Sequence, residues 1–518
     1  MRYSPKEIKV RLFLTCWLVF VLHFATDFAR EHYLVLSIVD DFSFRLDEYV
    51  GLNNDIFVTP NHGAHHGANP GASILAVLPY VVFKPIIDRV VNHVKLTRES
   101  EEAHTAVYRD ERPARVEFYK RVRARGLDIK FGLVGFVTMA FCMAPLSAAS
   151  AVVMFDATSY LGLTKGVSLG MSFLYAFGTP VFFRTGYLNQ NLMVGIFAFI
   201  AFILLWRLKN SSPRDIHKRF CAAGFLGGLA LLCDYSGGIV LAMLGAYGFL
   251  RRLDSVSWWT SLRDSLWYAA GAIGPVALLW FYQWRSFGHP FYPPQHFMPP
   301  QIYSETGYQG IFWPSGELLA MLLFDPQFGF FITTPIMLLA FLAPALSYLR
   351  SNIVPMRETL FIFLFFAAFA LFFGSVQYTR LQWITGIRYI VPVIPFLFML
   401  VVAVLVRMPR IIAYGFVILA IIEAWSMSMF RRVDVPGEGV LTTVIRFCFE
   451  GFQLPWLSTL GKMGTQYAPF VDGRTISPLP FFVLGSVLIY AIWCVRHPWV
   501  RLDKANGGVN ECKGNFFQ

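Results

Sequence analysis

The residues of this chain best suited to chemistry lie in one polar segment, residues 40–79, which follows the first apolar stretch. Its carboxylates are Asp40, Asp41, Asp47, Glu48 and Asp55, and its histidines are His62, His65 and His66. A carboxylate can act as a general base that removes a proton from an attacking group. The histidines can contact a phosphate or a sugar, ligate a metal, or only stabilise the loop. Histidines at this spacing without a firm carboxylate partner are poor evidence for a metal site, and because the chain also has no Asp-x-Asp motif, we predict that it holds no metal.

The composition is that of a membrane protein. Of the 518 residues, 56% are apolar and only 15% are charged, whereas soluble domains have roughly 45–50% and 25%. The apolar runs approach the roughly 20 residues that a helix needs to cross a bilayer, and they are too continuous for barrel strands. The net charge of +12 fits lysines and arginines gathered in cytoplasmic loops, so we expect membrane lipids and no nucleic acid as partners. The scattered cysteines favour neither disulfides nor a zinc site.

The predicted fold is therefore all-α, a polytopic membrane helix bundle of about 11–13 transmembrane helices. The predicted spans are residues 10–26, 71–88, 130–153, 167–184, 190–206, 220–250 (long enough for two short helices), 265–285, 328–348, 358–375, 388–406, 411–429 and 477–495.

Charge predicts which loops share a face of the membrane. The loops 88–130 and 207–219 and the tail from Arg496 are basic, which predicts that they are cytoplasmic. The long aromatic loops would then form the outer face, and they are residues 27–70, 286–327, 376–387 and 430–476. Three spans separate the two basic loops, although two cytoplasmic loops require an even number. Either one of these runs is re-entrant or one basic loop lies outside.

Several short motifs follow one another in an order that resembles a known family. They are Asp47-Glu48-Tyr49, Pro70-Gly71, Phe177-Gly178-Thr179-Pro180, GLALLCDYSGG (residues 228–238), FGHPFYPP (287–294), LLFDPQFGFFITTPIMLLA (322–340) and Thr385-Gly386-Ile387-Arg388-Tyr389 before VPVIPF. Together they resemble the bacterial GT-C glycosyltransferases, polytopic enzymes related to protein mannosyltransferases and aminoarabinose transferases. The resemblance covers about residues 10–405. It departs from the family at Ala68-Asn69, where a basic residue often precedes the Pro-Gly pair.

The resemblance implies roles for particular residues. Asp47 would be the general base, with Glu48 beside it and Asp40, Asp41 and Asp55 in reserve. Arg388 would bind the lipid phosphate, helped by the neighbouring Tyr389. Further contacts to phosphate or sugar would come from Arg380, His65, His66 and Asp234. From residue type alone, Asp47 could instead cap or stabilise a loop, and Asp234 could cap the break before Gly237-Gly238. Arg388 could simply extend its guanidinium to the membrane–water interface and bind no substrate.

The implied function is transfer of a sugar from a polyprenyl-phosphate donor to an acceptor on the outer face, with inversion and without a cofactor. Residues 1–405 would form the catalytic module and residues 406–518 the C-terminal helices, the outer loop 430–476 and a cytoplasmic tail. We expect a bacterial inner-membrane location, and neither the sugar nor the acceptor (protein, lipid or glycan) follows from the sequence. The alternatives are a lipid-linked-sugar flippase or other transporter, and a non-catalytic assembly protein.

Overall fold

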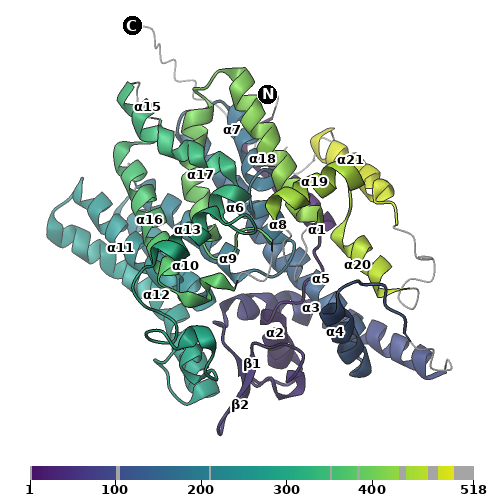
Figure 1. The fold of residues 1–518 in the computed structure, drawn as a ribbon. Helices are drawn as coiled ribbons and strands as arrows, with labels where there is room; N and C mark the ends of the chain where they lie inside the picture. The colour runs from purple at the N-terminus through teal and green to yellow at the C-terminus, as the bar shows by residue number, and fades with distance from the viewer. Residues whose placement is uncertain are drawn as a thin grey trace, which may run out of the picture.

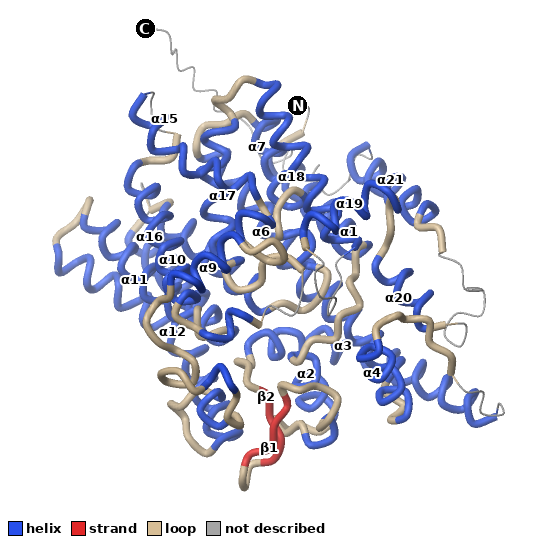
Figure 2. The backbone as a smooth tube through the Cα atoms, in the orientation of Figure 1, coloured by secondary structure: helices blue, strands red, loops and turns tan. Residues whose placement is uncertain are grey.

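The computed structural model describes residues 3–100, 106–208, 212–349, 353–381, 385–430, 439–464 and 476–494. Helices form most of this part of the chain, and its one sheet is a two-stranded hairpin near the N-terminus (Figures 1 and 2). The predicted tail from Arg496 lies outside the described residues, as do residues 431–438 and 465–475 of the predicted loop 430–476.

The first helix and the first loop form the start of the fold. Helix α1 (Pro5–Leu22) begins at a capping box in which Ser4 and Glu7 satisfy each other's backbone N–H groups. The loop that follows contains α2 (Glu31–Asp40), the short 3-10 helix η1 (Asp47–Tyr49) and strands β1 (Ile56–Thr59) and β2 (Gly63–His66). The strands pair antiparallel, with Ile56 opposite His66 and Thr59 opposite Gly63.

Helix α3 (Gly71–Ser100) contains the whole predicted span 71–88 and continues as a helix through the start of the predicted loop 88–130. The first half of α3 contacts the first loop: Ser73 Oγ donates to Glu31 O (2.8 Å), and Lys84 pairs with Asp40 (2.6 Å).

The segment after α3 returns to the same part of the first loop, so the predicted outer side of residues 27–70 and the predicted cytoplasmic side of residues 88–130 cannot both hold. In and after α4 (Pro113–Ala124), Arg121 donates to Gly51 O (3.1 Å), and Arg125 donates to Glu48 O (2.8 Å) and Val50 O (2.9 Å). Loops in direct contact cannot lie on opposite faces of a bilayer. The two loops therefore share one face. The arginines of this segment donate to backbone carbonyl groups of the first loop and pair with nearby acids, so a count of basic residues alone does not assign the face.

The central bundle follows. Its helices are α5 (Asp128–Thr138), continued through the π-helical turn η2 (Met139–Met143) into α6 (Ala144–Tyr160), then α7 (Lys165–Phe177), α8 (Val181–Thr185), α9 (Gln190–Trp206), α10 (Pro213–Cys233), α11 (Gly237–Leu253) and α12 (Trp258–Phe287). Glycines let α10 and α12 approach closely: a Cβ on Gly224 would lie 1.9 Å from Tyr268 O, and one on Gly271 would lie 2.0 Å from Cys221 O. The start of α3 also packs on this bundle, since a Cβ on Gly71 would lie 2.5 Å from Cys233 N.

The C-terminal half completes the core. Its elements are η3 (Pro294–Phe297), η4 (Ile302–Ser304), α13 (Gly316–Phe324), α14 (Phe330–Thr333), η5 (Pro335–Leu342), α15 (Ala343–Leu349), α16 (Met356–Gly374), η6 (Gln377–Arg380), η7 (Val391–Val393), α17 (Ile394–Leu405), α18 (Arg410–Phe430), α19 (Val440–Glu450), α20 (Pro455–Met463) and α21 (Leu479–Cys494). Every residue of α17 is buried, and α17 packs against η5 and α9 at the centre. Helix α21 packs on α1, where Trp493 Nε1 donates to Thr15 Oγ1 (3.0 Å).

Within the described residues, 5 helices are long and apolar enough to cross a membrane: Asp128–Tyr160, Pro213–Cys233, Trp258–Phe287, Met356–Gly374 and Arg410–Phe430. Shorter apolar helices are Gln190–Trp206, Pro335–Leu346, Val391–Leu405 and Leu479–Cys494. An all-α membrane protein fits this fold, whereas the larger count of 11–13 spans stays a prediction.

Candidate functional site

A polar cavity of about 700 Å³, here called the polar chamber, lies where four distant parts of the chain meet. The first loop supplies residues 27–31, Tyr33 and residues 51–55. Helix α4 supplies Arg115 and Arg121, residues 187–191 form another wall, and Arg388 completes the lining. Charged and amide side chains dominate this lining, so the chamber suits a polar or ionic ligand.

An ion pair lies at the centre of the polar chamber. Arg30 Nη1 donates to Asp55 Oδ2 (3.0 Å), and Arg30 Nε lies 3.3 Å from Glu31 Oε1. Asn53 Oδ1 accepts from the backbone N–H of Asp55 (2.9 Å), a local turn that fixes the start of β1. The side chain of Asp55 is 46% exposed and that of Arg30 is 19% exposed. Both line the cavity, so a ligand there can reach them.

The charge state of Asp55 follows from its neighbours. Burial alone would raise the pKa of Asp55, but Arg30 and then Arg388 stabilise the carboxylate and lower the pKa below its usual value. Burial acts in the opposite sense on Arg30, and the charges of Asp55 and Glu31 outweigh it and raise its pKa. At neutral pH the chamber therefore presents an ionised carboxylate beside two guanidinium groups.

A buried arginine positions Arg388. Arg184 is fully buried and donates through Nε to Ile387 O (2.6 Å) and through Nη2 to Gly386 O (2.6 Å). Gly386 has φ +86°, a conformation that side-chain-bearing residues rarely adopt. Arg388 follows this turn, and its guanidinium lies 5.1 Å from the centre of the Tyr389 ring.

Several buried polar atoms at the chamber have no hydrogen-bond partner among the described residues. Tyr33 Oη, Gln190 Oε1 and Asn191 Oδ1 belong to residues of the lining. His66 Nε2 is another, and the charges of Arg30 and Asp55 act on this ring. His66 Nδ1 accepts from the backbone N–H of Ala68 (3.1 Å), so Nε2 carries the proton of the neutral ring. Unpaired buried donors and acceptors are costly, and here they offer hydrogen bonds to a hydroxyl-rich or anionic ligand.

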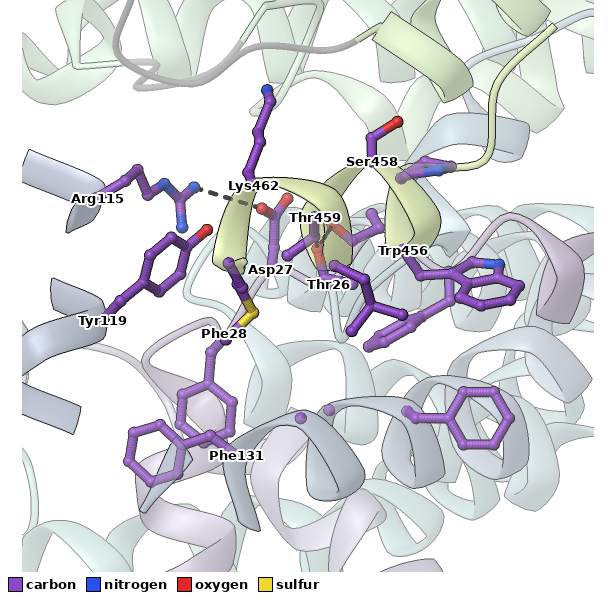
Figure 3. Close-up of a pocket in the computed structure, with 18 of the residues that line it drawn as sticks. Thr26, Asp27, Phe28, Arg115, Tyr119, Phe131, Trp456, Ser458, Thr459 and Lys462 are labelled. Atoms are coloured by element: carbon purple, nitrogen blue, oxygen red, sulfur yellow. Dashed lines mark hydrogen bonds and ion pairs between the residues drawn. The ribbon is translucent and has the colours of Figure 1, made fainter. Parts of the chain in front are cut away.

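A second cavity of about 630 Å³, here called the apolar groove, adjoins the polar chamber. Its walls come mainly from the end of α1, from α4 and α5, and from α20, with aromatic residues such as Phe131 and Trp456 (Figure 3). Asp27, Phe28, Arg115 and Phe118 line both cavities. Arg115 points toward Asp27 at this junction (3.5 Å; Figure 3). The two cavities thus join an apolar surface to a charged one.

Asp47, the predicted base, is not among the residues that line the polar chamber. Its Oδ2 pairs with Arg45 Nε (2.9 Å), and its Oδ1 accepts from the backbone N–H of Ala64 (2.7 Å), which joins η1 to β2. The side chain of Glu48 is exposed, and its backbone oxygen accepts from Arg125. These contacts match the structural role that residue type alone allowed for Asp47.

The other predicted residues divide between the chamber and its surroundings. Arg388 lines the chamber, with Tyr389 beside it. Asp234 accepts from Ser236 N (2.9 Å) and Oγ (2.6 Å) at the break between α10 and α11, and from Gln190 Nε2 (2.9 Å). Asp234 therefore does not line the chamber itself but fixes the side chain of Gln190, which does.

Arg380 and His65 are engaged elsewhere. Arg380 is exposed and pairs with Glu317 (2.7 Å). Both ring nitrogens of His65 lie 3.0 Å from backbone oxygens, those of Phe44 and His62. Neither residue lines the polar chamber.

Sequence reasoning missed Arg30, Glu31 and the polar run Asn189-Gln190-Asn191. The available signal was a charged pair shortly after the first apolar run and three consecutive amides at the start of another. No group of three or more His, Cys, Asp or Glu side chains in the described part of the chain could hold a metal ion. The metal-free site stays a prediction.

The fold and the cavities define a class, an all-α membrane protein with an amphipathic cavity. Compared with protein families, with curated proteins and with solved structures, the chain matches none.

Proposed function

We propose that the chain is a membrane glycosyltransferase of the GT-C type, which moves a sugar from a polyprenyl-phosphate donor to an acceptor on the outer face of the bacterial inner membrane. The observation that supports it best is the junction of the apolar groove with the polar chamber. A lipid-linked sugar has the same two parts, an apolar chain and a charged, hydroxyl-rich head.

In this proposal Asp55 replaces Asp47 as the general base. Asp55 would take the proton of the acceptor hydroxyl while the oxygen of that hydroxyl bonds to the anomeric carbon. At the same time the bond from the anomeric carbon to the phosphate oxygen would break. Arg30 and Arg388 would stabilise the charge on the departing phosphate. One displacement of this kind inverts the anomeric centre. Phosphate is a good leaving group, so a base with a low pKa suffices.

The test is turnover by the purified full-length protein in detergent. The donors are synthetic polyprenyl-phosphate hexoses and pentoses, lipid and protein extracts serve as acceptors, and mass spectrometry follows the release of polyprenyl phosphate. A transporter has no measurable activity without two compartments, so turnover in detergent separates the enzyme from the flippase alternative. If no donor is consumed and cells with and without the protein carry identical glycans, the proposal fails.

A further inference from the structure

A third cavity, of about 610 Å³, lies on the other side of the β1–β2 hairpin, and it shares no lining residue with the polar chamber. It is here called the hairpin cavity. Its walls are residues 42–45 of the first loop, the hairpin around His62, and the C-terminal end of α12. Neighbouring side chains of a strand point to opposite faces. His65 lines the hairpin cavity, whereas His66 is close to the charges of the polar chamber.

The hairpin cavity presents cations. Arg285 is exposed, and it makes no hydrogen bond or ion pair with any residue that the structure describes. Arg45 contributes a second guanidinium, paired on one side with Asp47 (2.9 Å). The two arginines and one carboxylate leave an excess of positive charge.

Two glycines in left-handed conformations make room for the polar side chains of this cavity. Gly63 has φ +84°, and a Cβ there would lie 2.4 Å from Arg45 Nε. Gly288 has φ +74°, and a Cβ there would lie 2.7 Å from His62 Nε2. The backbone is thus shaped to let Arg45 and His62 lie close against it, so the cavity is built by the fold.

Exposed aromatic side chains line the cavity and suit the level of the lipid headgroups. Phe281 and Trp284 are 47% and 53% exposed near the end of α12, one of the helices that can cross a bilayer. Exposed tryptophans at helix ends gather at the level of the lipid headgroups. Phe42 is 94% exposed and has φ +51°, an unfavourable conformation for a bulky residue. A strained backbone that directs a phenylalanine outward is typical of a functional contact.

We propose that the hairpin cavity binds the phosphate of an anionic membrane lipid. Arg45 and Arg285 contact the phosphate oxygens, and Phe42, Phe281 and Trp284 lie along the glycerol and the first acyl carbons. Arginine suits this role because its planar donors match phosphate oxygens. The site is separate from the polar chamber, and it does not depend on the glycosyltransferase proposal.

Native mass spectrometry of the full-length protein in detergent tests this site, with dioctanoyl phosphatidic acid as the probe. Arg285→Gln removes a charged hydrogen bond to the phosphate, which contributes about 1.4 kcal/mol. Binding of the probe is therefore expected to weaken about tenfold. Arg45→Gln is a second variant, expected to act in the same direction. The matched control is Arg263→Gln, an exposed arginine at the opposite end of α12, which is expected to bind as the wild type does.

Other probes decide what the cavity recognises. Dioctanoylglycerol, which lacks the phosphate, is expected not to bind at the concentration that saturates phosphatidic acid. Equal binding of dioctanoylglycerol overturns phosphate recognition, and equally tight binding of inorganic phosphate overturns the lipid as the ligand. Unchanged binding by both the Arg285 and Arg45 variants, or an equal loss in Arg263→Gln, overturns the assignment of the cavity.

Discussion

Replacing Asp55 by Asn removes the charge that faces Arg30 and Arg388 while keeping the shape of the side chain. The turn made by Asn53 uses the backbone N–H of Asp55, so the start of β1 should be unchanged. Arg30 retains Glu31 at 3.3 Å, and the lost pair is partly exposed, so we expect a stability cost of only about 1 kcal/mol. Transfer should fall by about 10²–10⁴, the usual contribution of a general base.

Asp47→Asn is the matched control for this prediction. Its ion pair with Arg45 is exposed on both sides, and an Asn oxygen can still accept from Ala64 N. We expect a cost below about 1 kcal/mol and unchanged transfer. Turnover of lipid-linked sugar and thermal unfolding would be measured for both variants at equal protein amounts. An inactive Asp47→Asn protein together with an active Asp55→Asn protein would refute our choice and restore the base that the motif implies.

Three further predictions concern the topology, the support of Arg388 and the pH dependence. Cysteines introduced at Asn61 and Lys120 should react with a membrane-impermeant maleimide from the same face; labelling from opposite faces would contradict the shared side of the two loops. Arg184→Gln leaves two backbone oxygens without their donor, so we expect the free energy of unfolding, measured by denaturation, to fall by about 2–4 kcal/mol. The displaced Arg388 should also bind polyprenyl phosphate more weakly, as measured by native mass spectrometry. Normal stability of the variant would refute the idea that Arg184 positions Arg388. Burial, and then the charge of Arg30, lowers the pKa of His66 to about 3. Below about pH 6.5 the unfolded chain therefore binds a proton on this ring that the folded protein does not bind. The free energy of unfolding then falls by up to about 1.4 kcal/mol for each pH unit as the pH drops. His66→Asn should flatten the fall of the unfolding temperature between pH 7 and pH 5, and an unchanged slope would contradict the neutral, buried ring.

Part of the fold could be predicted because a single local rule governs it. Long apolar runs must form helices where water cannot satisfy the backbone, so the sequence indicated the long apolar helices and an all-α protein. Pro70-Gly71 correctly marked the start of a helix. The opposite faces predicted for the loops 27–70 and 88–130 cannot both hold, because Arg121 and Arg125 are bound to the first loop and counting basic residues ignores such partners.

The sequence by itself determined that this protein is a helical membrane protein whose polar groups concentrate in the first loop, because composition and run length are local properties. Only the tertiary structure decided which carboxylate of that loop lines the polar chamber with Arg30 and Arg388. Asp47 and Asp55 have the same chemistry and lie eight positions apart. The hairpin that follows directs Asp47 to Arg45 and Asp55 to Arg30. The chamber also needs Arg388, more than three hundred positions away in the sequence, and long-range packing alone brings such residues together.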